Sequence, residues 1–99
     1  MASGSPISVP YRLGTHQSKA YTGTAGTITT AVGTHTQVVR VYCTTAAFIE
    51  IGNSPTAVAA TSVPIAADTP EYFLISPGMK VSAIQSASGG NLHVTELSR

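Results

Sequence analysis

The three histidines are the residues of this chain best suited to hold a metal ion. Zinc sites in proteins need three or four ligands, which usually arrive as closely spaced pairs of Cys or His. His16, His35 and His93 stand singly, and the sequence has one cysteine. His93 also lies inside an apolar segment, between Leu92 and Val94. We therefore expect three polar surface histidines and no metal site.

Serine nucleophiles need a histidine base and a strained turn between a strand and a helix, with the pattern G-x-S-x-G. The nearest approach in this sequence is the run Gly52, Asn53, Ser54, Pro55 and Thr56. It lacks the final glycine and carries Pro55 where the helix should begin. We predict a turn here and no nucleophile.

Acid–base catalysis would have to use Glu50, Asp68, Glu71 and Glu96, which are all the carboxylates of the sequence. Glu50 and Glu96 occupy outward positions of expected strands. Cys43 lies in an apolar, β-branched segment with no lysine nearby and no helix N-terminus to lower the pKa of its thiol. This setting favours an inert, packed thiol.

The glycine-rich run at residues 23–26 is the closest approach to a phosphate-binding loop. Such loops carry a lysine and lead from a strand into a helix, and neither feature follows this run. We predict no catalytic residue, no cofactor-binding residue and no metal ligand. The chain is therefore expected to need no cofactor and not to be an enzyme.

Charged residues make up 9% of the sequence and hydrophobic residues 42%, with a formal net charge of +1. The five basic residues are scattered and form no patch for binding phosphates, so we expect no nucleic acid partner. No apolar run approaches the length that crosses a membrane, so we expect no membrane partner either. Dispersed charge normally keeps small domains apart in solution. Its scarcity predicts a homo-oligomer.

Residues 1–23 differ from the rest of the chain. Pro and Gly interrupt this polar stretch, while Ile7, Val9, Tyr11 and Leu13 place apolar side chains at alternate positions. A period of two is typical of an extended chain with one apolar face. We predict an extended N-terminal arm over residues 1–23 and a folded domain over residues 24–99.

Short β-branched segments separated by Gly, Pro, Asn and Ser fill that domain, a pattern typical of strands and turns. Residues 37–44 are partly apolar on both faces, which favours a central strand. Pro64 limits its segment to a sheet edge or a bulge. The expected strands are residues 27–32, 37–44, 47–51, 57–65, 71–75, 80–86 and 91–97.

Two connections between these strands have distinctive turn residues. Pro77 and Gly78 stand where a type II turn over residues 76–79 requires them, because proline presets φ and glycine accepts a positive φ. Ser88, Gly89 and Gly90 favour a β-hairpin between the last two strands.

Short strands at roughly ten-residue spacing with no helix predict an all-β fold. We expect a small single-domain β-sandwich of about seven strands, and both jelly-roll-like and immunoglobulin-like topologies fit this spacing. A chain of 99 residues has room for one such domain.

Three stretches of the sequence have the order Phe-x-x-Ile-Gly, Glu-Tyr-Phe with a Pro-Gly turn, and Leu-x-Val-Thr-Glu-Leu. They are residues 47–52, 70–85 and 90–97. This order resembles that of small β-rich virion proteins of tailed bacteriophages. The likeness brings with it no catalytic residue.

The resemblance implies a structural role in the virion, most specifically as a capsid decoration or cement protein that binds the assembled head in many copies and stabilises it. Its partners would be the major capsid protein or other virion subunits. Its location would be the virion, assembled in the host cytoplasm. The alternatives are a neck, tail or fibre-anchoring virion protein and a carbohydrate-binding β-sandwich module, although the sequence has no tryptophan for a sugar platform.

Overall fold

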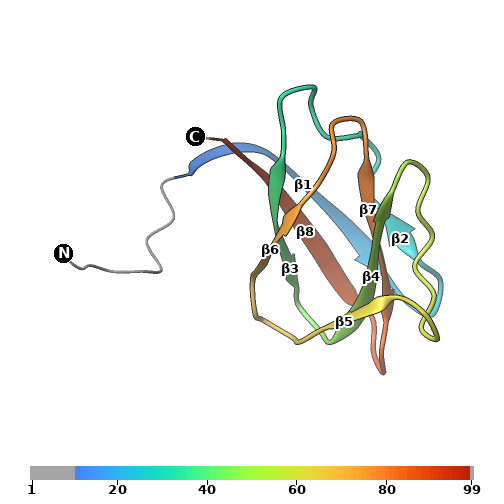
Figure 1. Cartoon of the computed structure of the whole chain (residues 1–99). Helices are drawn as coiled ribbons and strands as arrows, with labels where there is room; N and C mark the ends of the chain where they lie inside the picture. Colours follow the sequence, from blue (N-terminus) through green and yellow to red (C-terminus); the bar gives the residue numbers. More distant parts are fainter. Residues whose placement is uncertain (1–10, 99) are drawn as a thin grey trace.

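The structure is a computed structural model that describes residues 11–98, and within this range the chain is all-β (Figure 1). These residues form no helix, and thus none that could cross a membrane. The strands of this range are β1 (Arg12–Tyr21), β2 (Gly26–Thr27), β3 (Val38–Cys43), β4 (Ala47–Gly52), β5 (Val63–Ile65), β6 (Glu71–Leu74), β7 (Lys80–Gln85) and β8 (Gly90–Ser98).

The described strands form two antiparallel sheets of four strands each. The first sheet has the order β1-β8-β3-β6 and the second the order β2-β7-β4-β5. Among these strands, β4 and β5 are the one pair of sequence neighbours that also pair in a sheet. Every other connection passes from one sheet to the other.

The hydrophobic core lies between the two sheets. Alternation along β3 buries Val39, Val41 and Cys43, each 0% exposed, while the intervening side chains are only half-buried. Val81 and Ala83 of β7 are equally buried from the second sheet. Each sheet therefore turns one apolar face inward, as period-two patterning requires.

Several expectations from the sequence are confirmed. The strand containing residues 37–44 is central, since β3 pairs with both β8 and β6. Pro64 lies in β5, at the edge of the second sheet. The Met79 amide donates to the Ser76 carbonyl at 3.2 Å, and Gly78 has φ of +85°, the geometry of a type II turn.

The predicted hairpin at residues 88–90 is wrong. β7 pairs with β4 and β2, whereas β8 pairs with β1 and β3, so the connection crosses between sheets. Gly89 and Gly90 instead allow the backbone to pass close to neighbouring residues, where a side chain would collide. A Cβ on Gly90 would lie 2.5 Å from Thr45 Oγ1, and one on Gly89 would lie 2.9 Å from the Tyr21 carbonyl oxygen.

The predicted arm over residues 1–23 also differs from the structure where the two can be compared. Residues 12–21 form β1, which pairs with β8 and ends in the buried Tyr21. The alternation noted in the sequence continues here as a sheet strand, because β8 offers it a free edge. Residues 1–10 of the predicted arm lie outside the described residues. β1 also explains why the described range has eight strands where about seven were expected.

Two of the expected strands are much shorter than predicted. Residues 27–32 contribute only Thr27 to a strand, although the amides of Ile28 and Val32 still donate to the carbonyls of Val81 and Met79 at 3.0 and 2.8 Å. Residues 57–65 begin with a turn, in which the Ser62 amide donates to the Val58 carbonyl at 2.8 Å. Ile28 and Val32 nevertheless pack into the core between the sheets, where they are 1% and 3% exposed.

Candidate functional site

The outer face of the second sheet is covered by the chain itself. Ser82 of β7 is 0% exposed although it points away from the core. Its hydroxyl accepts the Ala57 amide at 3.0 Å and shares a 3.0 Å hydrogen bond with the Thr27 hydroxyl. The Ser62 hydroxyl donates to Glu50 Oε1 at 2.9 Å. These bonds hold residues 53–62 against β4 and β7 and close this face.

The outer face of the first sheet has no such cover among residues 11–98. The register of the four strands arranges its side chains in rows that cross the sheet. One row is wholly apolar and is called here the apolar row. It consists of Leu13 of β1, Leu97 of β8, Val38 of β3 and Leu74 of β6, each paired with the next.

The two ends of the apolar row are the most exposed large hydrophobic side chains of the described residues. Leu13 is 78% exposed and Leu74 is 83% exposed. Leu97, between them, is buried but does not belong to the core between the sheets. Exposed apolar side chains are ordinary when scattered, whereas a contiguous patch marks an interaction surface. The register makes the row contiguous, and its exposed surface is concentrated at its two ends.

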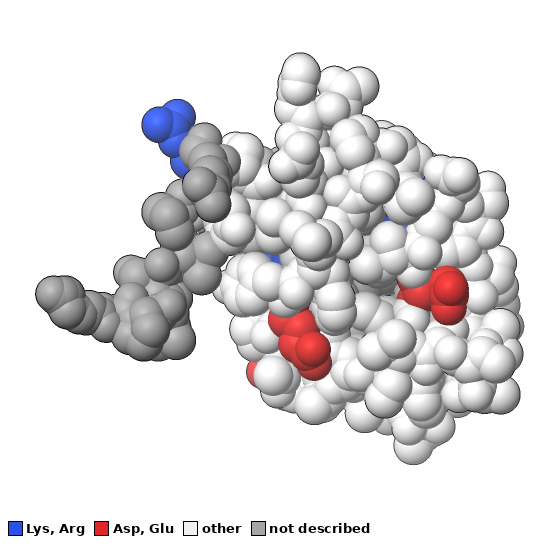
Figure 2. Space-filling view, viewed as in Figure 1, with Lys and Arg blue, Asp and Glu red and all other residues white. Residues whose placement is uncertain are grey.

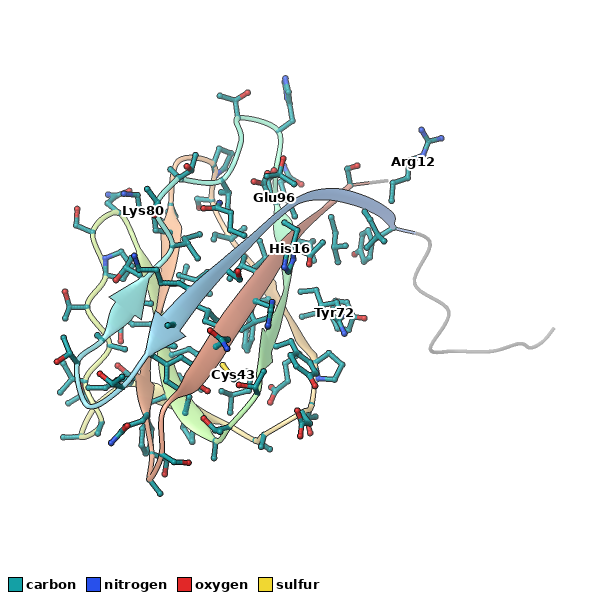
Figure 3. The ribbon with its side chains drawn as sticks, turned by 180° about the vertical axis from the view of Figure 1, so that it is seen from behind. Arg12, His16, Cys43, Tyr72, Lys80 and Glu96 are labelled. Atoms are coloured by element: carbon teal, nitrogen blue, oxygen red, sulfur yellow. The ribbon has the colours of Figure 1, made fainter. Side chains whose placement is uncertain are left out.

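Tyr11 and Tyr72 extend the apolar row on the same face. Tyr11 borders three open hollows, which it shares with members of the row and with Tyr72 of β6. Tyr72 is 50% exposed and projects beside β3 and β6 (Figure 3). Tyr11, the first described residue, therefore lies beside the apolar row.

Beside the apolar row, the same face carries a cluster of rings. The pairing of β1 with β8 sets His16 opposite Thr95 and Ser18 opposite His93, so His16 and His93 lie two residue pairs apart on the same face. His16 Nδ1 lies 2.9 Å from Thr95 Oγ1, and His16 Nε2 lies 3.2 Å from His93 Nδ1. The two imidazoles stack with centroids 5.3 Å apart. Tyr42 meets His93 edge-on at 6.0 Å.

Tyr42 links this ring cluster to charged groups. Its hydroxyl donates to Asp68 Oδ1 at 2.6 Å, and the Arg40 guanidinium lies 5.5 Å from its ring centroid. The hydrogen bond to Asp68 raises the pKa of the Tyr42 phenol, with smaller contributions from burial and the carboxylate charge. Asp68 adopts φ of 55°, a left-handed conformation in which aspartate is enriched.

From the sequence we expected three separate surface histidines, and the structure brings two of them together. His16 and His93 are far apart in the sequence and meet only through the register of β1 on β8, which no local pattern specifies. His35 lies elsewhere, beside Gln37 and Leu74. Across residues 11–98, no three His, Cys, Asp or Glu side chains come together as a metal site would require.

The remaining residues considered for chemistry have structural surroundings. Ser54 lies in an exposed bend after β4. Cys43 is in the core, where burial raises the pKa of its thiol to about 11 against a weaker opposing effect of Tyr21. Glu96, expected to point outward, is half-buried. It accepts the Gly33 amide at 3.1 Å and the Thr36 hydroxyl, and so fixes the loop before β3.

Charge contributes little to the surface. Figure 2 shows a mostly uncharged face on which a few charged side chains stand apart from one another. No family model, no curated protein and no solved structure matches this chain. The outer face of the first sheet is therefore the feature from which a function can be inferred.

Proposed function

We propose that this chain is a structural component of a tailed-phage virion, most specifically a capsid decoration protein that binds the assembled head in many copies. The observation that carries the proposal is the apolar row on the open face of the first sheet. It supports a role in which this face is covered by other protein subunits, because such a patch is otherwise left in water.

The energetic reason is the hydrophobic effect. Burying apolar surface yields roughly 25 cal/mol per Å², and Leu13 and Leu74 expose most of their side chains. A ligand that binds only the assembled shell stabilises that shell by mass action. Repetition over many copies multiplies a modest contact energy. Few charges are needed for contacts of this kind, in keeping with a charged fraction of 9%.

The strand order supports a finer fold assignment within the proposal. The orders β1-β8-β3-β6 and β2-β7-β4-β5 match an eight-stranded, two-sheet jelly roll. An immunoglobulin-like sandwich would instead pair β1 with β2. Jelly rolls are frequent in viral capsid domains and in lectins, so this assignment is compatible with a virion role and with the carbohydrate-binding candidate below.

The partner in this proposal is the major capsid protein, and copy number tests it. Virions would be purified from the phage that encodes the chain, and the chain quantified by mass spectrometry against the major capsid protein. A decoration protein is expected at a copy number comparable to that of the capsid subunit. A few copies per particle would favour a neck, tail or fibre-anchoring component. Absence from purified virions would contradict the proposal.

A carbohydrate-binding module is the second candidate. The observation that favours it is the ring cluster of His16, His93 and Tyr42, with the exposed Tyr72 on the same face, since aromatic rings stack on sugars. A glycan array probed with the purified protein tests it. Binding that Tyr72→Ala abolishes would support this candidate, provided that Val58→Ala, an exposed change on the loop over the second sheet, retains it.

A further inference from the structure

The open face of the first sheet has an apolar row at its surface and the first described residue, Tyr11, beside it. Tyr11 shares hollows with Val38, Leu74 and Leu97. The ten residues that precede Tyr11 are therefore attached to the molecule at this patch. A protein segment that covers the apolar row must therefore lie beside Tyr11 and the first residues of β1.

Residues 1–10 have apolar side chains at alternate positions near their end, as a segment that binds an apolar row requires. Ile7 and Val9 continue the alternation of Tyr11 and Leu13 without a break. In an extended chain all four side chains point to the same side. Ten extended residues reach about 33 Å, whereas four strands at about 4.8 Å spacing place the ends of the row about 14 Å apart. The segment is long enough to cross the whole row of another molecule.

The direction of the chain favours a neighbouring copy over the same molecule. A residue before proline is biased toward an extended conformation, so Pro10 favours an extended Val9. A residue in that conformation would continue the direction of β1 beyond the sheet. A return to the row of its own molecule would need a reversal at Pro10, where the alternation runs on unbroken.

We infer that residues 6–10 of one copy lie across the apolar row of a neighbouring copy. Each molecule gives one segment and receives one, which is a heterologous contact that closes into a ring or joins copies in series. This inference goes beyond the proposed function, because it names a second copy of the chain, and not the capsid subunit, as the occupant of the apolar row. It concerns the isolated protein and does not depend on attachment to a virion.

Disulfide trapping tests the inference. Ile7→Cys and Leu74→Cys variants with different affinity tags are mixed under mild oxidation, and linked chains are separated on non-reducing gels. The native Cys43 is 0% exposed and stays in place. We expect the mixed dimer to form at least about tenfold faster than in the control mixture, because docking holds the two thiols at high effective concentration. The control replaces Leu74→Cys by Val58→Cys, which is apolar and 47% exposed but lies on the loop that covers the second sheet.

Two outcomes would overturn the inference. In the double variant Ile7→Cys/Leu74→Cys, a fast intrachain disulfide at high dilution would mean that the segment covers its own row. Equal rates for the Leu74 and Val58 mixtures would mean that it covers neither. Thermal melts of each variant check that the fold is intact, which is expected because Leu74 is 83% exposed. Absence from virions alongside fast mixed-dimer formation would refute the proposed function and leave this inference standing.

Discussion

At the residue scale, the Cys43 thiol loses its proton less readily in the folded protein than in the unfolded chain. It is 0% exposed, and burial raises its pKa from an ordinary 9.0 to about 11. The folded state therefore holds the proton more tightly than the unfolded chain does. The resulting stability is complete below pH 9 and is lost as the pH rises toward 11.

This predicts a decrease of up to ~3 kcal/mol in the free energy of unfolding between pH 9 and 11, attributable to Cys43. Urea titrations at several pH values measure it. The matched control is Cys43→Ala, which lowers stability by leaving a small cavity but removes the titrating group. If the curves of the two proteins stay parallel across this range, the thiol does not contribute in this way.

Gly78 is the second prediction at this scale. Its φ of +85° lies in the left-handed region, yet a Cβ there would meet nothing within 4 Å. Any cost of a side chain is therefore backbone strain. Gly78→Val should lower the free energy of unfolding by about 1–2 kcal/mol. Gly52→Val is the control, since its φ is not positive and its Cβ would come no closer than 4.0 Å to Pro55. Equal melting temperatures for the two variants would contradict the turn assignment.

At the element scale, the loop over residues 53–62 depends on Ser82. Ser82→Ala would leave the Ala57 amide without its acceptor and the Thr27 hydroxyl without one of its partners. A buried donor left without a hydrogen bond lowers the free energy of unfolding by about 1–3 kcal/mol. Denaturant unfolding should show this loss, and amide exchange at Ala57 should accelerate. Ser54→Ala, in an exposed bend, should change stability by far less. A Ser82→Ala protein as stable as the parent would refute the role assigned to this hydroxyl.

The elements themselves were largely predictable from the sequence. Alternation and β-branching place β3, β4, β6, β7 and β8 close to their observed bounds, because these patterns act locally. The partner of each strand was not predictable. The hairpin expected at residues 88–90 is absent because β7 and β8 pair in different sheets, and Gly89 and Gly90 instead allow close approach of β1 and the β3–β4 loop. Glycine alone does not distinguish a tight turn from a close approach.

The same limit applies to the candidate site. Leu13 and Leu74 were visible in the sequence as members of separate apolar segments, and only the order β1-β8-β3-β6 aligns them with Val38 and Leu97. The bulge in β1 between Leu13 and His16 adds a further shift. A one-residue change in register would move these side chains to the opposite face. Interaction surfaces on sheets therefore emerge from pairing.

At the scale of the whole molecule, the two sheets differ in whether the chain covers their outer faces. The second sheet is covered by residues 53–62, while the first sheet leaves the apolar row open among the residues that the structure describes. With a charged fraction of 9%, the chain has little electrostatic repulsion to oppose contact between copies. On this asymmetry we base the inference that a neighbouring copy completes the outer face of the first sheet.

Sedimentation velocity over a concentration series tests this central claim most directly. The wild-type protein is expected to sediment as an oligomer whose mass falls toward the 10.1 kDa of a single chain on dilution. Leu13→Ser/Leu74→Ser, which removes the exposed ends of the apolar row, should sediment as a single chain at every concentration with little change in melting temperature. Val58→Ser/Val63→Ser alters two exposed valines away from the apolar row, one in the loop over residues 53–62 and one in β5, and should behave as the wild type. A wild-type protein that stays a single chain throughout, or an oligomer that persists in Leu13→Ser/Leu74→Ser, would contradict the account.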